Sequence, residues 1–280
     1  SFSFDANHQL KTVKSKPGRA IDGEALGPVV VEAASSAQRA GELPYKNTRA
    51  KVTSDDLGVS DFRTVVASFD TPLTDEYIRT QNLIRGAEKV TGVVVKPDEV
   101  FSLIDALSPI TAAGGYYPAH IIVNGYITDG IGGGLSQMAT TAYNAAYFAG
   151  LEDVEHRPHT KYFTRYPAGR EATIYVGALD MRFRNNTPYA LVMSSYVEAG
   201  RPHVERWSTQ HDPVQPRASD RTNVTPAEMT ESDHEGCIDT PVGEPGFTIT
   251  NWREVYLKGV LVDETSYTWT YRPNDGVKCV

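Results

Sequence analysis

The 280-residue chain has few cysteines, no block of basic residues and no long apolar run. Its 27 Lys and Arg residues are outnumbered by 35 Asp and Glu residues, for a formal net charge of −8. Phosphate binding requires clustered Lys and Arg, so a nucleic-acid partner is not expected. No run reaches the roughly 18 to 20 apolar residues that a membrane-spanning helix needs. The 40% of apolar residues still suffice for a sizeable core and exclude a disordered chain.

The two cysteines, Cys237 and Cys279, both lie in the last fifth of the chain. One far-spaced pair fits a single disulfide that closes a loop of roughly 40 residues in an exported protein. Two unrelated buried thiols are the alternative. The chain begins at Ser1 without a signal-peptide pattern. Any export signal or membrane anchor is therefore expected upstream.

Residue patterns divide the chain into four stretches. Residues 1–57 read as short strands and turns, with too little apolar content for a core of their own. A helical period begins near Leu73 and is followed by strand-like stretches. Residues 208–244 are rich in Pro, Ser, Thr, Asp and Glu, which is typical of a linker or a long excursion. Residues 247–273 alternate in polarity and predict a β-hairpin.

The segment 130–150 is the most informative part of the sequence. Its glycines supply a sharp backbone turn, and Ser136 stands where a helix would begin. Met138 and a series of alanines then form an apolar face of small residues, and Gly150 provides a stop. Small residues allow close approach of a neighbour, so this helix is expected to be central. The sequence predicts an α+β fold with a mixed or antiparallel sheet packed on this Ala-rich helix, and a β-rich C-terminal tail.

Four motifs give the chain a family resemblance. They are Gly-Gly-Gly-Leu-Ser-Gln-Met-Ala-Thr-Thr-Ala-Tyr-Asn-Ala-Ala at 132–146, Arg-Pro-His at 157–159, Tyr-Pro-Ala-Gly-Arg-Glu-Ala-Thr at 166–173 and Phe-Arg-Asn-Asn at 183–186. Together they resemble the VanW family over roughly residues 60 to 200. The resemblance implies a Gram-positive cell-envelope protein, from a family named through an accessory gene of vancomycin-resistance clusters.

The resemblance also implies a domain organisation. Family members often carry an upstream membrane anchor and a peptidoglycan-binding region, and residues 1–57 would suit the end of such a region. Residues 58–207 would form the VanW-like domain. Residues 208–280 would form a linker and a hairpin tail closed by a Cys237–Cys279 disulfide.

Ser136 occupies a position where many relatives have cysteine. A thiol there is favoured by the helix dipole, which stabilises the thiolate. In transglutaminase-like folds a helix-borne cysteine is followed in sequence by a histidine and then an aspartate. Ser136, His159 and Asp180 follow that order, as nucleophile, base and orienting carboxylate. Alternatively, Ser136 simply caps the helix, and Asp180 pairs with a nearby arginine.

Further side chains are candidates for the same cleft. Backbone N–H groups of the turn that contains Gly133 and Gly134, or the Gln137 amide, would hold an oxyanion. Two successive threonines inside a helix need a reason: they bond back to the preceding turn or line the cleft. An aromatic ring would stack on a sugar, and an arginine would bind a stem-peptide carboxylate. The remaining binding candidates are Thr140, Thr141, Asn144, Tyr166 and Arg170.

His156 and His159 have a spacing that could share a metal on a helix. Pro158 between them argues against a helix, and no acidic or cysteine partner stands at ligand spacing. No metal and no cofactor are expected.

The sequence thus predicts an extracytoplasmic cell-wall protein that engages peptidoglycan or its precursors through a cleft at the Gly-rich turn. A binding or accessory module is the first interpretation. The alternative is an enzyme that transfers acyl groups or hydrolyses amides in peptidoglycan peptides, with Ser136 at the nucleophile position. Contact with a membrane is expected only through an upstream anchor.

Overall fold

The computed structural model describes residues 2–12, 15–50, 53, 64–123, 126–209, 214–234, 237–257 and 259–280. About 18% of the described residues are helical and 40% are in strands, which confirms the predicted α+β class. The predicted boundary between residues 57 and 58 lies outside the described residues, so that boundary stays a prediction.

Four helices lie within the described residues. They are α1 (Gly23–Ser35), α2 (Tyr77–Val90), α3 (Leu103–Leu107) and α4 (Leu135–Phe148). The strands are β1 (Phe2–Phe4), β2 (Leu10–Thr12), β3 (Gly18–Ile21), β4 (Tyr45–Thr48), β5 (Thr64–Asp70), β6 (Val94–Val95), β7 (Val100–Ser102), β8 (Pro118–Val123), β9 (Tyr126–Ile131), β10 (Glu152–Glu155), β11 (Arg182–Arg184), β12 (Leu191–Glu198), β13 (Arg201–Ser208), β14 (Val214–Ala218), β15 (Thr222–Thr225), β16 (Met229–Ser232), β17 (Gly246–Leu257), β18 (Val260–Tyr271) and β19 (Gly276–Cys279).

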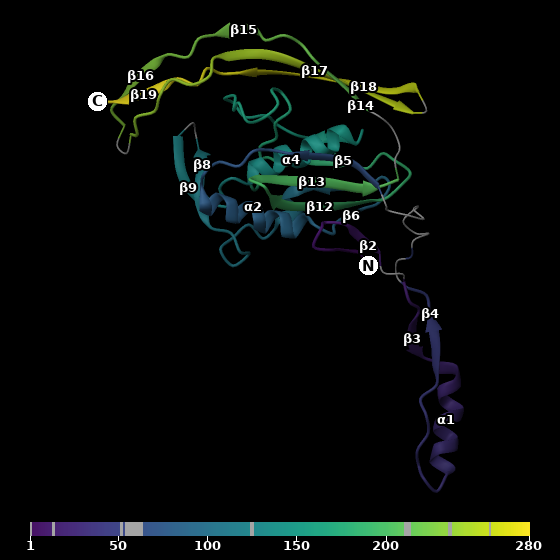
Figure 1. Cartoon of the computed structure of the whole chain (residues 1–280). Coiled ribbons are helices and arrows are strands. Elements are labelled where there is room, and N and C mark those ends of the chain that lie inside the picture. Colours follow the sequence, from purple (N-terminus) through teal and green to yellow (C-terminus); the bar gives the residue numbers. More distant parts are fainter. Residues whose placement is uncertain are drawn as a thin grey trace.

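The centre of the molecule is an antiparallel sheet with the strand order β5-β13-β12-β6. Helix α4 contacts β5 and β13, and helix α2 contacts β12 and α4 (Figure 1). Leu83 of α2, Met138 of α4, and Met193 and Val204 of the sheet are all fully buried in one core cluster.

Helix α4 is buried along most of its length. Twelve of its fourteen residues are buried, because its many alanines let neighbouring elements approach closely. The turn before it depends on glycine. A Cβ on Gly133 would lie 2.4 Å from backbone atoms of Ala119, and Gly134 has a left-handed backbone with φ of +96°. The Gly-rich motif therefore brings the start of α4 directly against β8.

The C-terminal region is built around the hairpin of β17 and β18, which confirms the predicted hairpin. The hairpin arches over the side of the domain that holds α4 (Figure 1). Residues 208–244 are more than the predicted linker. They contribute β14 and β15, which pair with β17, and β16, which pairs with β19. Most side chains of β14, β15 and β16 are exposed, so this stretch adds backbone pairing rather than core.

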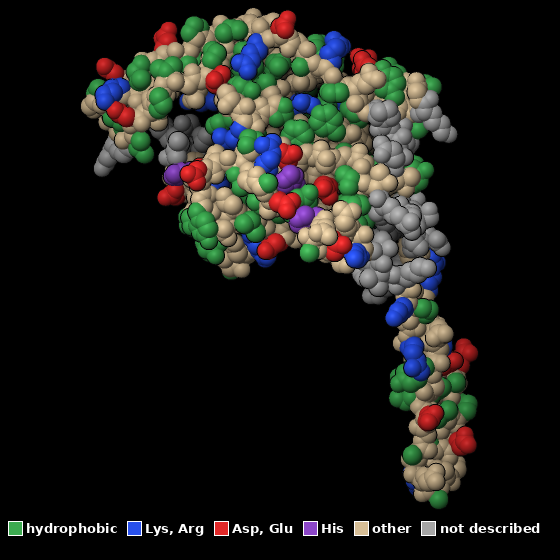
Figure 2. Space-filling model, viewed as in Figure 1, with side chains coloured by type: hydrophobic (Ala, Val, Ile, Leu, Met, Phe, Trp, Pro, Cys, Tyr) green, Lys and Arg blue, Asp and Glu red, His purple; other side chains and the backbone are tan. Residues whose placement is uncertain are grey.

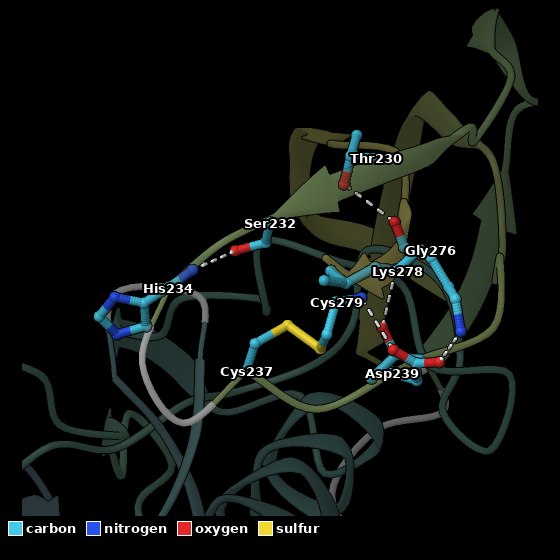
Figure 3. Close-up of a disulfide and its surroundings, with 10 residues drawn as sticks. Thr230, Ser232, His234, Cys237, Asp239, Gly276, Lys278 and Cys279 are labelled. Carbon is cyan, nitrogen blue, oxygen red and sulfur yellow. Dashed lines mark hydrogen bonds and ion pairs between the residues drawn. A yellow bond between two sulfur atoms is a disulfide. The ribbon is translucent and has the colours of Figure 1, made fainter.

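A disulfide joins Cys237 to Cys279 across 42 residues of sequence, as predicted. Figure 3 shows it beside the parallel pair β16–β19. Asp239 supports the same corner, since its carboxylate accepts a hydrogen bond from the Cys279 N–H and pairs with Lys278. The bond thus ties the end of the chain to the start of the segment that leads into β17.

The N-terminal residues form two small units. The β1–β2 hairpin lies on the domain, with Phe4 packed edge-on against Trp207. Strands β3 and β4 and helix α1 form an arm, residues 15–50, that projects away from the rest, and Figure 2 shows hydrophobic side chains on its surface. None of the described helices is long and apolar enough to cross a membrane.

Candidate functional site

A pocket of about 510 Å³ opens at the start of α4. The Gly-rich turn and the first turn of α4 form its floor, and the β8–β9 hairpin and the loop 173–179 form walls. Two of the three predicted catalytic residues, Ser136 and His159, line this pocket. Arg79 of α2 lines it too, and so do Arg165 and Tyr166.

Ser136 does not cap the helix, contrary to the alternative interpretation. Helix α4 begins at Leu135 with Gly134 as its N-cap, so Ser136 already lies within the first turn. Its hydroxyl oxygen accepts a hydrogen bond from the backbone N–H of Ile174 at 3.3 Å. Gly134 takes the N-cap position because the backbone there is left-handed, a conformation that suits glycine. The half-buried hydroxyl is therefore left facing the pocket.

His159 is held by a buried carboxylate, which belongs to Glu171. The His159 ring nitrogen Nδ1 pairs with Glu171 Oε2, and the two side chains are 14% and 0% exposed. A ring that donates from Nδ1 keeps its other nitrogen, Nε2, for proton exchange. The ring of Tyr166 stacks on the imidazole, and Phe163 meets it edge-on.

The C-terminal hairpin completes this arrangement. The hydroxyl of Tyr271 donates to Glu171 Oε1 at 2.9 Å and accepts from the Gly169 N–H at 2.7 Å. Burial, reinforced by the charge of Glu171, raises the pKa of Tyr271, so this phenol stays a donor at neutral pH. The indole of Trp269 donates to the backbone carbonyl of His159 at 2.9 Å. Side chains from β18 thus fix both members of the His159–Glu171 pair.

Asp180 is not the orienting carboxylate, so that prediction is wrong. Its oxygens accept hydrogen bonds from the Ser102 hydroxyl at 2.5 Å, the Ile104 N–H at 3.0 Å and the Met181 N–H at 2.7 Å. It accepts a hydrogen bond from a backbone N–H group at the start of α3, which has no partner within the helix, and it does not line the Ser136 pocket. No described arginine pairs with it either, since its partners are a hydroxyl and backbone groups.

Known proteins match the chain over this region. The family described as "VanW like protein" matches residues 78–207, which include α4, His159 and Glu171. This match identifies residues 78–207 as a VanW-family domain. The chain is 32% identical to "Uncharacterized protein YoaR" of Bacillus subtilis (strain 168) over 166 residues, which cover 55% of this chain and 52% of that protein. The chain thus spans about half the length of this relative, and no solved structure matches it.

Within the VanW match, three predicted binding residues are used inside the fold. The Gln137 amide donates to Thr71 and to the carbonyl of Pro72, and it accepts from Arg79. Thr140 exchanges hydrogen bonds with the backbone of Ala172. Thr141 bonds back to the carbonyl of Gln137. All three are fully buried, so their side chains hold α4 in place, and the Gln137 amide is not free for an oxyanion.

The turn offers two backbone groups in place of that amide. The N–H groups of Gly133, Leu135 and Gln137 already donate to carbonyls within the turn. The remaining N–H groups, those of Gly134 and Ser136, stay candidates for binding an oxyanion.

Asn144 and Arg170 also lie outside the Ser136 pocket. The Asn144 amide is buried and donates to the carbonyls of Thr140 and Arg170. Arg170 lines a second pocket, which shares no residue with the Ser136 pocket. Of the predicted binding set, Gly134, Gln137 and Tyr166 line the Ser136 pocket, but the Gln137 amide is already engaged within the fold.

The pocket is rich in positive charge. Arg79 and Arg165 line it, and the Nε atom of each is buried without a hydrogen-bond partner among the described residues. The guanidinium of Arg165 lies over the rings of Phe163 and Tyr166 at 4.6 and 4.8 Å. Such groups suit a carboxylate or a developing oxyanion.

Glu171 and Tyr271 were missed by the sequence reasoning. Glu171 had a signal, because it lies within the motif 166–173 that carries the family resemblance. Tyr271 had none, since it is 100 residues away from its partner. His156, the other member of the H-x-x-H pair, binds Asp153 instead. In the described ranges, no three His, Cys, Asp or Glu side chains are placed to hold a metal ion.

Proposed function

We propose that this chain acts at the bacterial cell wall, outside the cytoplasm, on the stem peptides of peptidoglycan. Its VanW-family domain supports a cell-wall role. In this proposal the Ser136 pocket binds a stem peptide and transfers or hydrolyses one of its acyl groups. The observation that carries the proposal is the pairing of His159 with the fully buried Glu171 at the pocket that Ser136 lines.

This layout supplies the groups that acyl transfer needs. The Ser136 oxygen attacks the amide carbonyl carbon while its proton passes to Nε2 of His159. That proton then moves to the amine nitrogen as the C–N bond breaks, which leaves an acyl ester on Ser136. Water or the amine of a second peptide takes the acyl group and returns a proton to the Ser136 oxygen through His159. Glu171 stabilises the imidazolium that forms in between.

The charged wall of the pocket supports a peptide with a free carboxylate. Arg79 and Arg165 carry buried Nε groups that such a ligand would satisfy. The N–H groups of Gly134 and Ser136 would face the oxyanion of the tetrahedral intermediate.

A wall-binding module without chemistry is the second candidate. It is favoured by the residue at position 136 itself, because a hydroxyl is far less acidic than the thiol of many relatives. The Ser136 oxygen also already accepts from the Ile174 N–H. In that case the same arginines would bind the stem peptide and His159 would only shape the pocket.

The two candidates are separated by incubating the protein with purified peptidoglycan and defined stem peptides, followed by mass spectrometry. The wild type is compared with Ser136→Cys, Ser136→Ala and Glu171→Gln. Asp180→Asn is the matched control, because it neutralises a nearby carboxylate that does not touch His159. Products from the wild type or Ser136→Cys that vanish in Ser136→Ala and fall at least 100-fold in Glu171→Gln, but persist in Asp180→Asn, support catalysis. Sacculus binding by every variant without products supports the binding module and refutes the enzyme.

A further inference from the structure

The second pocket, of about 450 Å³, lies between α4 and the inner face of the β17–β18 hairpin. Residues from the domain and from the hairpin contribute to it. Tyr143 and Tyr147 come from α4, and Asn251, Arg253 and Tyr267 come from the hairpin. Neither Ser136 nor His159 lines it. It is therefore a separate site, formed only where the C-terminal hairpin covers the VanW domain.

Two arginines form the inner part of this pocket. Arg253 is 4% exposed; it donates from Nη1 to the carbonyl of Leu151 at 2.6 Å, and its Nε has no partner among the described residues. Arg170 is half-buried, with its guanidinium over the rings of Tyr147 and Phe148. Its Nη1 is buried without a partner, and no described carboxylate lies within ion-pair distance of it. A buried guanidinium without an acidic partner is costly unless a ligand completes its hydrogen bonds.

Three carboxylates stand nearer the solvent. The side chains of Glu152, Asp153 and Asp263 are 52%, 33% and 43% exposed, whereas Arg253 is almost fully buried. Each carboxylate already has a partner: Glu152 pairs with Arg184, Asp153 with the His156 ring nitrogen Nδ1, and Asp263 with Arg253. The pocket is thus positive inside and negative at its mouth.

This gradient selects one class of ligand. A dianion such as phosphate would be repelled by the carboxylates at the mouth, and a simple cation would meet the arginines inside. A group that carries a carboxylate at one end and an ammonium at the other satisfies both. The three tyrosine rings supply apolar walls and hydroxyls for the part between the charges.

We propose that this pocket binds the zwitterionic form of a short peptide, with its carboxylate on Arg170 and Arg253 and its ammonium group toward Glu152 and Asp153. The site does not depend on the reaction at Ser136. No residue lines both pockets, but Arg170 of this site directly precedes Glu171, which pairs with His159. A peptide held here would sit beside the segment that positions His159.

The test measures binding of D-alanyl-D-alanine to the full chain by isothermal titration calorimetry. The same dipeptide with an acetylated amine, and with its carboxylate converted to an amide, isolates each charge. We expect both modified forms to bind at least about tenfold more weakly, since each loses charge-assisted hydrogen bonds. No binding of the zwitterion by the wild type, or equal binding of the acetylated form, would overturn the proposal.

Variants locate the binding. Arg170→Gln is expected to weaken binding of the dipeptide at least tenfold, and Arg170→Lys less, because it keeps the charge but loses the planar donor pair. Arg217→Gln is the matched control: Arg217 also stacks on an aromatic ring, that of Trp252, but neither residue lines the pocket. Unchanged binding by Arg170→Gln, or an equal loss in Arg217→Gln, would refute this site.

Discussion

Helices α1 and α4 have nearly the same length and are both rich in small apolar residues, yet their surroundings are opposite. None of the thirteen residues of α1 is buried, whereas twelve of the fourteen residues of α4 are. In α1, Val31 is 68% exposed, and in α4, Met138 is fully buried. The difference arises from what the rest of the chain places over each helix. Helix α4 contacts β5, β13 and β10, whereas no described helix or strand packs extensively on α1.

The comparison teaches that apolar content alone does not make a core. A two-stranded hairpin and one helix cannot cover enough surface to offset the entropy of ordering them. The arm therefore shows apolar side chains to solvent, such as Val30 and Tyr45. The domain, in contrast, gathers segments that are distant in sequence around one helix.

The test with the largest expected effect truncates one side chain in each helix. Met138→Ala is expected to lower the free energy of unfolding by about 2 to 5 kcal/mol, because it leaves a cavity in the main core. Val31→Ala in α1 should change it by less than about 0.5 kcal/mol, since the side chain is mostly exposed. Urea unfolding followed by circular dichroism measures both. Equal losses would mean that α1 is buried against another surface in solution.

The C-terminal strands resemble the arm in exposure, but a covalent bond closes them. Replacing both Cys237 and Cys279 by serine is expected to destabilise the C-terminal region by about 4 kcal/mol, from the loop entropy of a 42-residue closure. Hydrogen exchange of β16 and β19 amides should show the loss, while amides of β12 and β13 stay protected. Unchanged protection of β19 in the double variant would argue that strand pairing alone holds this region.

Alkaline pH tests the buried tyrosines outside the arm. Burial raises the pKa of Tyr116 to about 12, and also raises the pKa values of Tyr143 and Tyr271. Above pH 10 the unfolded chain loses these protons and the folded chain keeps them, so stability falls as pH rises. Each tyrosine contributes at most about 1.4 kcal/mol per pH unit. Urea unfolding at pH 8 to 11 should show that the unfolding free energy falls less steeply with pH in Tyr116→Phe than in the wild type.

The smallest effect is expected from removing the arm. Replacing residues 15–50 by a short Gly-Ser linker keeps the β1–β2 hairpin and the domain. Because α1 buries no residue, the melting temperature of the domain should change by no more than about 2 °C. A fall of more than about 5 °C would contradict the separation of arm and domain.

The sequence predicted those parts of the fold whose signal is local. The Gly-rich turn before α4 is marked by its own residues, the β17–β18 hairpin by its alternation, and the disulfide by the count of cysteines. The motif 132–146 also placed Ser136 correctly at a helix start, but not which residue would cap it. Gly134 takes that place because its backbone is left-handed, which sequence spacing does not reveal.

The parts that could not be predicted depend on which segments meet in space. Glu171 and Asp180 are both acidic residues after His159. The cysteine–histidine–aspartate order of transglutaminase-like folds favoured Asp180. The choice is made by the path of the segment 166–171, which carries Glu171 beneath the imidazole, while Asp180 is drawn to the start of α3. In the same way, Thr140 and Asn144 face the backbone of 170–172 rather than a cleft.

The dependence of His159 on the C-terminal hairpin has a consequence for how the protein matures. Trp269 and Tyr271 contact His159 and Glu171 across 110 and 100 residues. A growing chain that has emerged only to residue 207 contains the whole family match and none of these contacts. Contacts of such sequence separation also form slowly. The nascent protein therefore passes through a period in which the His159–Glu171 pair lacks the hydrogen bonds that Trp269 and Tyr271 supply, and the site is completed last.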